Sequence, residues 1–285
     1  MPTFRITVAY DGTSFVGWQR QANGTSIQGL LEDALRGLDG REVVVHGAGR
    51  TDAGVHALGQ AASFTLVRAI KATAVLRAMN AQLPDAIRVV RAGEVDPAFH
   101  ARYGARAKTY CYRILHSDLP DVFERAYAWH LSGTLDLRAM QEAARLLEGR
   151  HDFAAFQASG ATTRTTEREL TTVRIFNTKD TKDTEEKPTL RTTVLHIPRV
   201  LRGGEFAPHG GELITIEITG AGFLRHMVRI IVGSLVEIGR GRRDAAWLAQ
   251  VLAARDRTLA GPTAPPGGLF LVHVAYPPDV LADEP

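Results

Sequence analysis

The residues of this sequence that are best suited to chemistry lie in a glycine-rich turn, where Arg50 and Asp52 stand among Gly47, Gly49 and Gly54. The first two glycines fit the start of a G-x-G-x-x-G phosphate loop, but Asp52 occupies its third glycine position. A carboxylate there would repel a pyrophosphate, and no Walker Gly-Lys-Ser/Thr follows, so both kinds of nucleotide-phosphate loop are excluded. Glycines let the backbone approach a ligand closely. Taken alone, however, the turn favours a hairpin with a local ion pair over a ligand site.

Two further arginines, Arg225 and Arg229, are four residues apart in a helix that the sequence predicts from about residue 223 to residue 238. Residues at this spacing share one face of a helix. At about 100° per residue, that face lies well away from the apolar stripe. Both guanidinium groups could therefore point into a groove, although a solvated basic face is the plainer alternative.

Four ring side chains are candidates for substrate contact, each with a structural alternative. Tyr110 lies on an alternating strand and Trp18 follows a glycine, so either ring could stack on a base or simply pack in the core. His56 and His226 could serve in acid–base chemistry or RNA contact. Burial with hydrogen bonds explains both histidines at least as well.

The sequence offers no recognisable metal or cofactor site. Its ten histidines include no H-x-x-x-H pair on a helix, and the single cysteine, Cys111, has no partner for a disulfide or a cysteine-based zinc site. No G-x-S-x-G pattern supports a serine hydrolase. We therefore expect no metal site.

Composition predicts a globular cytoplasmic protein of one large or two smaller domains. The 285 residues are 45% hydrophobic and 23% charged, and no apolar run is long enough to cross a membrane. Residues 1–10 alternate like a strand, unlike a signal peptide. Only five of the 34 basic residues are lysine. Arginine suits bidentate contacts with phosphates, but a GC-rich genome explains the same bias.

Strands and helices alternate along both parts of the chain, which predicts a mixed α/β architecture. We expect an N-terminal half over residues 1–104, which carries the Asp52 turn, and a C-terminal half over 105–285 with an exposed insertion near 177–211. Strands are predicted at 3–10, 42–46, 62–67, 87–90, 108–115, 171–176, 213–219 and 269–276. Helices are predicted from a Thr25 capping box through Leu38, around 75–79 and 137–147, over 223–238, and from an Asp244 cap onward.

The octapeptide Gly49-Arg50-Thr51-Asp52-Ala53-Gly54-Val55-His56 closely resembles the signature of the tRNA pseudouridine synthase A family. Further segments, in order from Tyr10 to Tyr276, are similar to the same family's pattern. They are Tyr10-Asp11-Gly12, Gly17-Trp18-Gln19-Arg20-Gln21, Phe99-His100-Ala101-Arg102, Tyr110-Cys111-Tyr112, Phe223, His226-Met227-Val228-Arg229 with Gly233, and Asp256-Arg257-Thr258-Leu259-Ala260. The insertion near 177–211 is longer than the family's usual connection there.

The resemblance implies a fold and an activity. The fold would be α+β: two similar halves sharing an extended, mostly antiparallel sheet, with helices on one side and a central cleft. The enzyme would be a cofactor-free, cytoplasmic homodimer that converts uridines 38, 39 and 40 in the anticodon stem-loop of tRNA to pseudouridine.

The resemblance also implies roles for individual residues. Asp52 would be the essential carboxylate and nucleophile, Arg229 its ion-pair partner, and Tyr110 would stack on the target base. Arg50 would hold the flipped nucleotide out of the helix. Arg225, His56, Trp18 and Arg20 would complete the substrate-binding set.

Two other functions fit parts of the sequence. A non-catalytic RNA-binding protein would use the same arginines and aromatic residues but would not require Asp52. A retaining N-glycosidase would place a carboxylate near C1′ but would release free uracil. A dehydrogenase is disfavoured, because Asp52 interrupts the glycine pattern. The sequence leaves open which tRNAs are served, which intermediate forms, whether subunits cooperate, and what the insertion and Cys111 do.

Overall fold

The chain folds into two compact units, Met1–Lys108 with residues 270 onward, and Thr109–Leu269. A computed structural model describes residues 1–160, 163–177 and 211–278. The C-terminal strand thus belongs with the N-terminal part of the chain, an association that the expected halves 1–104 and 105–285 do not include. Apart from its two end residues, the insertion expected near 177–211 lies outside the described residues.

The first unit is built on the strand order β4-β1-β3-β10. Its strands are β1 (Thr3–Tyr10), β3 (His56–Thr65), β4 (Ile87–Val95) and β10 (Leu269–Ala275), and the short β2 (His46–Gly47) pairs with β3. β1 is antiparallel to both β3 and β4, whereas β10 runs parallel to β3, with Phe270 opposite His56. The segment between β2 and β3 carries the Asp52 signature.

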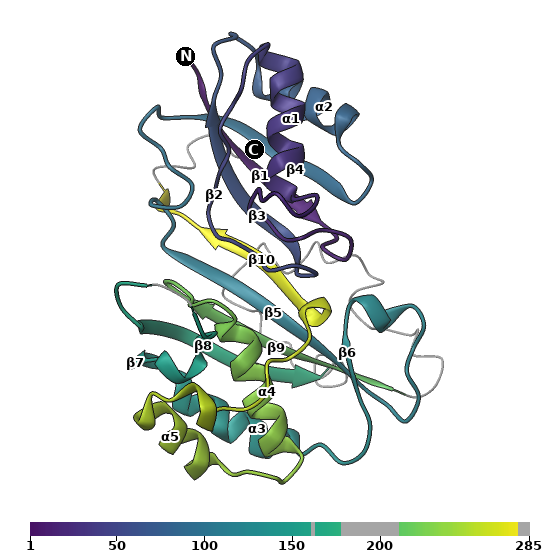
Figure 1. Ribbon diagram of the computed structural model, residues 1–285, viewed down its shortest axis with the longest axis vertical. Helices are drawn as coiled ribbons and strands as arrows, with labels where there is room; N and C mark the ends of the chain where they lie inside the picture. The colour runs from purple at the N-terminus through teal and green to yellow at the C-terminus, as the bar shows by residue number, and fades with distance from the viewer. Residues whose placement is uncertain (161–162, 178–210, 279–285) are drawn as a thin grey trace. The chain divides into compact units, whose positions relative to one another are not determined.

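The helices α1 (Ile27–Asp39) and α2 (Ala72–Gln82) lie on one face of the first unit's sheet (Figure 1). The predicted alternation of β1 is confirmed, since Phe4, Ile6 and Val8 are fully buried. Apolar residues of α1, including Leu31 and Leu35, are also fully buried. Burial of such side chains is the main favourable contribution to folding here.

The second unit has the strand order β5-β9-β8-β7. Its strands are β5 (Ala107–His116), β7 (Gly149–Asp152), β8 (Glu167–Asn177) and β9 (Glu212–Gly220), and β6 (Trp129–Leu131) adds to β5 in parallel. β8 is antiparallel to β7 and to β9. Burial raises the pKa of the Cys111 thiol on β5, which keeps that thiol protonated and unreactive.

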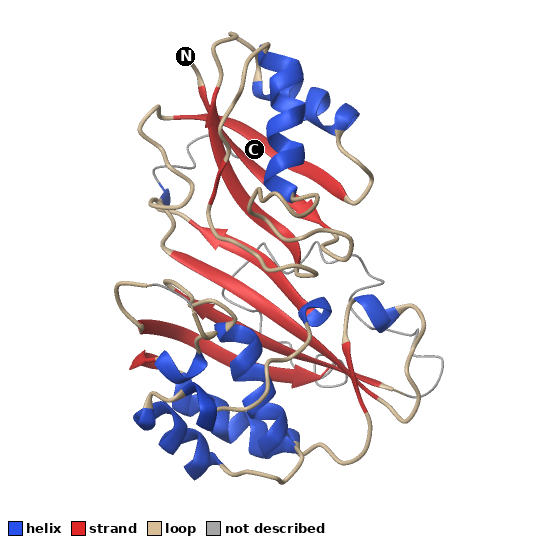
Figure 2. Ribbon diagram, viewed as in Figure 1, coloured by secondary structure: helices blue, strands red, loops and turns tan. Residues whose placement is uncertain are grey.

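Three helices gather on one side of this second sheet, as Figure 2 shows in blue: α3 (Leu137–Ala144), α4 (Met227–Gly239) and α5 (Ala245–Ala254). The carboxylate of Asp244 accepts a hydrogen bond from the Trp247 amide at 2.8 Å, so the predicted cap of α5 is confirmed. Single-turn 3-10 helices complete the unit at Glu124–Ala126, Arg145–Leu147, Ala154–Phe156, Arg257–Leu259 and Pro266–Gly268. Both units combine helices with mostly antiparallel strands, which confirms the predicted α+β class.

Three predicted boundaries are wrong, each for a local reason. The α1 cap is Ser26, whose hydroxyl accepts from the Gly29 amide, and not Thr25. The strand expected at 42–46 is reduced to β2, because only His46 and Gly47 pair with β3. The helix expected from residue 223 begins at Met227, because His226 has a left-handed backbone with φ +62°.

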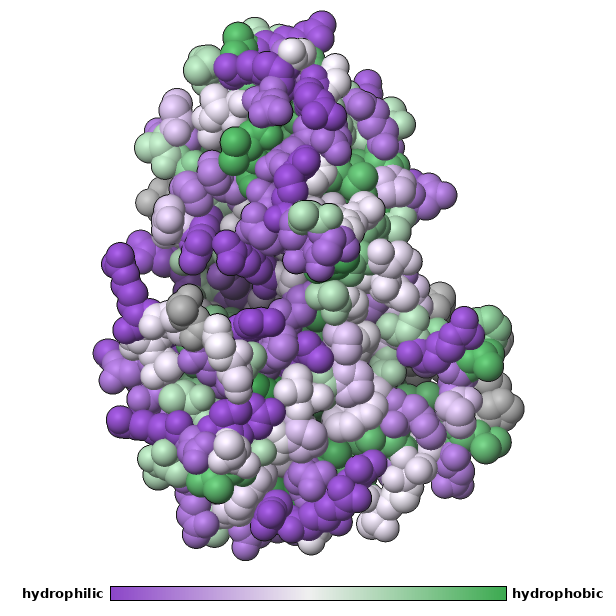
Figure 3. Space-filling model, in the orientation of Figure 1, coloured by the Kyte–Doolittle hydropathy of each residue, from purple (hydrophilic) through white to green (hydrophobic). Residues whose placement is uncertain are grey.

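Hydrophilic residues predominate over α1 on the face of the molecule shown in Figure 3, with isolated apolar residues among them. Among the described residues, no helix has both the length and the apolar character that a membrane crossing requires.

Candidate active site

The Asp52 loop, residues 48–55, connects β2 to β3 and is clamped immediately before its carboxylate. The Thr51 carbonyl accepts a hydrogen bond from the Trp18 amide at 3.1 Å. The buried Thr51 hydroxyl is hydrogen-bonded to the Tyr10 hydroxyl at 2.8 Å. The Asp52 carbonyl in turn accepts from the Val55 amide at 3.1 Å, which closes a tight turn. The Asp52 side chain is half-buried. The hydrogen bonds on either side of it hold the backbone that carries it.

The opposite end of the loop is anchored to β3. The Ala48 amide donates to the Ala61 carbonyl at 2.8 Å, and the Gln60 side-chain amide donates to the Gly49 carbonyl, also at 2.8 Å. Gln60 is fully buried, so this bond ties the loop to the core of the unit. Both ends of the loop are therefore held within the first unit.

Two glycines are required where the segment after β1 passes close to the backbone of the Asp52 loop. A Cβ at Gly17, where φ is +107°, would stand 2.6 Å from the Thr51 carbonyl oxygen. A Cβ at Gly12 would stand 2.0 Å from the Val55 carbonyl oxygen. Any side chain at either position would push the loop away, so both glycines are part of what positions Asp52.

His56, which directly follows the loop, is a buried and hydrogen-bonded histidine. Its Nδ1 accepts from the Gly12 amide at 3.0 Å and lies 3.2 Å from the Asp11 carboxylate, and its ring stacks on Phe270 with centroids 4.7 Å apart. Its side chain is 1% exposed. The structure therefore gives His56 the packing role that the sequence left open as an alternative.

Trp18 is likewise inside the unit, at 2% exposure. Its ring packs near Tyr10 and covers Gly47, where an added Cβ would stand 2.4 Å from the indole. Trp18 supports the loop from the interior, through both its ring and its backbone amide. In contrast, Arg50 is exposed on the loop's surface.

Arg20 faces α1. Its guanidinium contacts the carboxylates of Glu32 at 2.8 Å and Asp33 at 3.2 Å, and donates to the Gly29 carbonyl at 3.0 Å. Hydrogen bonding to these carboxylates, chiefly Asp33, raises the pKa of Arg20. These contacts orient the side chain along the helix.

In the second unit, Tyr110 lies on β5 with its ring 7% exposed. The ring meets Phe223 edge to face, with centroids 4.9 Å apart and planes at 76°. This contact fixes the ring orientation, because edge-to-face pairs of this kind are favourable. Phe223 belongs to the segment that leads into α4.

Arg225 and Arg229 do not share a helix face, contrary to the sequence prediction. Arg225 precedes the helix and is exposed, and its carbonyl accepts from the Ala158 amide. Arg229 lies in the first turn of α4, where its Nε donates to the Ala264 carbonyl at 2.7 Å. The Arg229 carbonyl accepts from the Ala264 amide at 3.0 Å. Arg229 is therefore held at both backbone and side chain.

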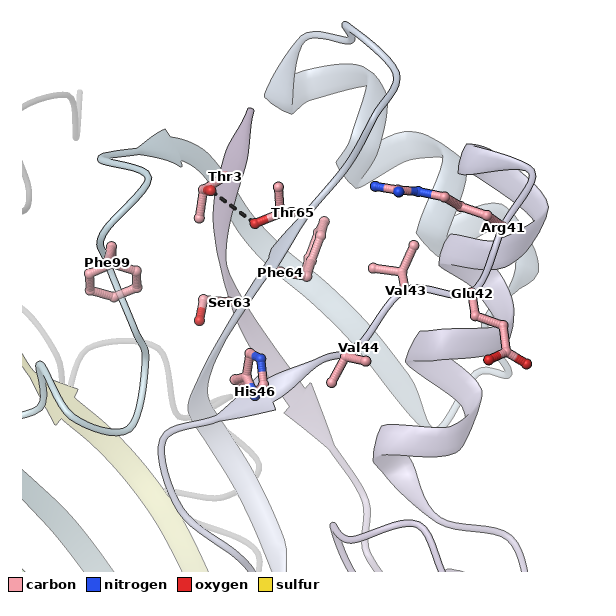
Figure 4. A pocket seen from close by; sticks show the side chains of 10 residues that line it. All are labelled: Thr3, Arg41, Glu42, Val43, Val44, His46, Ser63, Phe64, Thr65 and Phe99. Carbon is pink, nitrogen blue, oxygen red and sulfur yellow. Dashed lines mark hydrogen bonds between the residues drawn. The ribbon is translucent and has the colours of Figure 1, made fainter. Parts of the chain in front are cut away.

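One pocket of the first unit, about 260 Å³ in volume, has no residue of the Asp52 loop in its lining. Figure 4 shows His46 and Phe99 at its edge, opposite the hydrogen-bonded hydroxyls of Thr3 and Thr65. Its volume is below the usual range for small-molecule sites, and it does not mark the active site. Within the described parts of the chain, no cluster of three or more His, Cys, Asp or Glu side chains could hold a metal ion.

The first unit therefore brings Arg50, Asp52, Trp18 and His56 to one loop and its support, while Tyr110, Arg225 and Arg229 belong to the second unit. Sequence reasoning missed the supporting residues Tyr10, Thr51 and Gln60. Tyr10 and Thr51 lie inside segments that were singled out, but their hydrogen bond joins residues 41 positions apart. Nothing in the local pattern indicates that pairing.

A family model for tRNA pseudouridine synthase matches residues 6–104 and 143–277 of the chain. Curated relatives match over nearly its whole length. The tRNA pseudouridine synthase A of Myxococcus xanthus is 40% identical, over 97% of this chain and 92% of the relative. The proteins of the same name from Syntrophotalea carbinolica and Moorella thermoacetica are 41% and 42% identical, over 98% and 97% of this chain and 98% and 100% of the relatives. The chain therefore belongs to the tRNA pseudouridine synthase family, isomerases that convert uridine in tRNA to pseudouridine.

Proposed function

We propose that this enzyme isomerises uridines 38, 39 and 40 in the anticodon stem-loop of tRNA, with Asp52 as its nucleophilic carboxylate. The observation that carries the role of Asp52 is its loop, which presents a half-buried carboxylate on backbone that is hydrogen-bonded at both ends. The three tRNA positions rest on the resemblance of the motifs. A carboxylate held in one place is what a reaction at a single nucleotide requires, since positioning alone removes a large part of a barrier.

The reaction breaks the N1–C1′ bond of uridine, rotates the uracil and joins C5 to C1′. The hydrogen of C5 leaves to solvent and N1 gains a proton, so atoms and charge balance with no external reactant. A carboxylate nucleophile, unlike a serine hydroxyl, needs no general base to activate it. The carboxylate would attack C6, attack C1′ or remove the C2′ proton; each route needs it beside the glycosidic bond of the target uridine.

The target base must leave the helix before a carboxylate can reach it, at a cost of a few kcal/mol. Arg50, exposed on the loop, would occupy the space that the flipped nucleotide leaves. Tyr110, whose ring is fixed by Phe223, would stack on the extruded uracil. These two roles, and that of Asp52, rest on the resemblance of the motifs together with this local geometry.

Arg229 would form an ion pair with the Asp52 carboxylate. This role also rests on the resemblance. The bond from its Nε to the Ala264 carbonyl supports it, since a fixed guanidinium loses less entropy when it binds a carboxylate. Arg225 and Arg20 would contact the RNA backbone, whereas Trp18 and His56 would act through the loop that they support. The enzyme would work in the cytoplasm as a homodimer without a cofactor.

The site specificity is tested with anticodon stem-loop transcripts that carry a single uridine at position 38, 39 or 40, and a control transcript with its uridine at position 33. Pseudouridine is mapped by mass spectrometry after nuclease digestion. We expect conversion at each of the three positions and none at position 33. Conversion confined to another part of a full-length tRNA would overturn the assignment of substrate position and leave the isomerase activity intact.

A further inference from the structure

Three ring side chains form a column on the surface of the first unit. The His46 and His100 rings have centroids 4.7 Å apart with planes at 33°, and the His100 and Tyr103 rings lie 4.3 Å apart at 38°. Tyr103 ends the column and is 78% exposed. We call these three rings the ring column. The Tyr103 ring contributes little to folding stability through burial, because most of its surface stays in water.

The loop between β4 and β5, which carries His100 and Tyr103, is held in place by hydrogen bonds. The Ala101 amide donates to the buried Ser63 hydroxyl at 3.0 Å, and the Ala101 carbonyl accepts from the Tyr276 hydroxyl at 2.6 Å. Within the loop, the Gly104 amide donates to the His100 carbonyl at 2.9 Å. Tyr103 is therefore an exposed aromatic side chain on a fixed support, which lowers the entropy lost when a ligand stacks on it.

Positive charge surrounds the ring column. The Arg102 guanidinium lies 5.9 Å from the Tyr103 ring centre. Desolvation and the neighbouring Arg102 lower the pKa of the half-buried Lys108, and no carboxylate contributes to that shift. Among the described residues, no hydrogen bond or ion pair of the Lys108 amine is recorded. Two cations close together without an anion mark a place that favours a phosphate.

This surface adjoins the Asp52 loop. A Cβ at Gly49 would stand 3.5 Å from the Lys108 amine, and Gly49 precedes Asp52 by three residues. His46 lies in β2, which leads directly into the same loop. A group bound at Lys108 would therefore lie beside the loop that carries Asp52.

The ring column does not fit a metal site. The Arg102 amide donates to Nδ1 of His100 at 3.1 Å, which occupies that nitrogen. Desolvation, His46 and Arg102 all lower the pKa of His100, and the positive charge of Arg102 would repel a metal cation. Neighbouring rings with an exposed aromatic side chain beside cations instead match the features that bind single-stranded nucleic acid.

We propose that the ring column, together with Arg102 and Lys108, binds an unpaired nucleotide adjacent to the target uridine. The base stacks on the exposed Tyr103 ring, and Arg102 and Lys108 hold its phosphates. This subsite rests on the proposed function, because it supposes that the target uridine is extruded toward Asp52. It would hold the RNA strand in register while the target base leaves the helix.

The direct test uses an anticodon stem-loop with 2-aminopurine in place of the nucleotide on either side of the target uridine. Stacking on an aromatic ring quenches this fluorophore. We expect quenching at one of the two positions with the wild-type enzyme and with Tyr103→Phe, and its loss with Tyr103→Ala. The matched control is Phe123→Ala in the second unit, since Phe123 is equally exposed, at 80%. Quenching that survives in Tyr103→Ala, or is lost equally in Phe123→Ala, overturns the proposal.

Measurements of stem-loop affinity at several salt concentrations distinguish the base-stacking contact from the phosphate contacts. Loss of one stacked base should weaken stem-loop binding by about tenfold or more in Tyr103→Ala, with the salt dependence unchanged. Lys108→Gln should reduce the slope of log Kd against log salt by about one. Unchanged affinity and slope in both variants would overturn the subsite. Tritium release by the wild-type enzyme, measured in parallel, keeps this failure distinct from a failure of the proposed function.

Discussion

The Asp52 loop and the segment that leads into α4 both turn the chain sharply before a regular element, and both carry residues that we assign to the reaction. They achieve the turn differently. The loop depends on Gly12 and Gly17 to let two backbone segments touch, whereas the α4 segment places a non-glycine residue, His226, in the left-handed region. The loop is defined by long-range contacts, and the α4 segment by a local backbone conformation.

The difference indicates which substitutions should disrupt each region. A glycine that a neighbouring carbonyl touches cannot accept even a methyl group, so the Asp52 loop depends strongly on single positions remote from Asp52. At the start of α4, Arg229 is held by Ala264 through two hydrogen bonds, and changes there should affect chemistry more than folding. The following predictions test this contrast.

The largest effect should come from Gly17→Ala. Its Cβ would stand 2.6 Å from the Thr51 carbonyl oxygen at a φ of +107°, so we expect a loss of about 3 kcal/mol in unfolding free energy and a large loss of turnover. The control is Gly40→Ala, with φ +76° and no atom within 4 Å; it should lose only about 1 kcal/mol. Urea denaturation measures both. Equal losses would show that the close approach is unimportant.

Arg229→Ala should lower kcat by about 100-fold, in the range seen when a charge-stabilising group is removed from an active site. Its effect on tRNA affinity should be far smaller, because at most one phosphate contact is lost. Arg225→Ala should show the reverse pattern, with weaker binding and a nearly unchanged kcat. Single-turnover kinetics at saturating tRNA give the comparison. Arg229→Ala turning over at the wild-type rate would remove Arg229 from the proposed chemistry.

Tyr10→Phe should destabilise the protein by about 1 kcal/mol, since it removes a buried hydrogen bond to Thr51. Tyr112→Phe is a matched change in the second unit, where the hydroxyl donates to the Pro265 carbonyl at 2.8 Å. Both variants should lose similar stability by thermal denaturation. Tyr10→Phe should lower kcat more than Tyr112→Phe, because Thr51 directly precedes Asp52, whereas Pro265 only follows the residue that holds Arg229. A kcat that falls equally in the two variants would argue against a special role for the clamp.

The smallest effect should come from Arg20→Ala. Its ion pairs with Glu32 and Asp33 lie at the surface, where such pairs contribute less than about 1 kcal/mol. If Arg20 also contacts RNA, the slope of log Kd against log salt should fall by about one. Filter binding at several salt concentrations measures this. A wild-type slope would leave Arg20 with only its structural contacts to α1.

The sequence predicted the class of fold and most strands because alternating burial and helical stripes are local signals. Phe4, Ile6 and Val8 are buried as their alternation required. The start of α4 was predicted wrongly because Leu224, which precedes the helix, is also buried and extends the apolar stripe. Periodicity reports which side chains face the core and does not report that His226 leaves helical geometry.

In the candidate site, too, some residues could be predicted from the sequence and others could not. Motif resemblance pointed to Asp52, Arg50, Tyr110 and Arg229, but it did not indicate how the loop is supported. Tyr10 contacts Thr51, and Gln60 contacts Gly49, across 41 and 11 residues respectively. The ring column joins His46 to His100 across 54 positions of sequence. Such contacts arise only when β1, β3 and the loop after β4 are assembled.

The most direct test of the role assigned to Asp52 measures tritium release from tRNA labelled at C5 of uridine. Forming the C5–C1′ bond expels that hydrogen, so tritium enters water as pseudouridine forms. Wild type and Asp52→Ala are compared, with Asp118→Ala as an exposed aspartate control, and filter binding confirms that each variant retains tRNA. We predict release by wild type and Asp118→Ala and none by Asp52→Ala. Release by Asp52→Ala at the wild-type rate would contradict the assignment of Asp52 as the nucleophile.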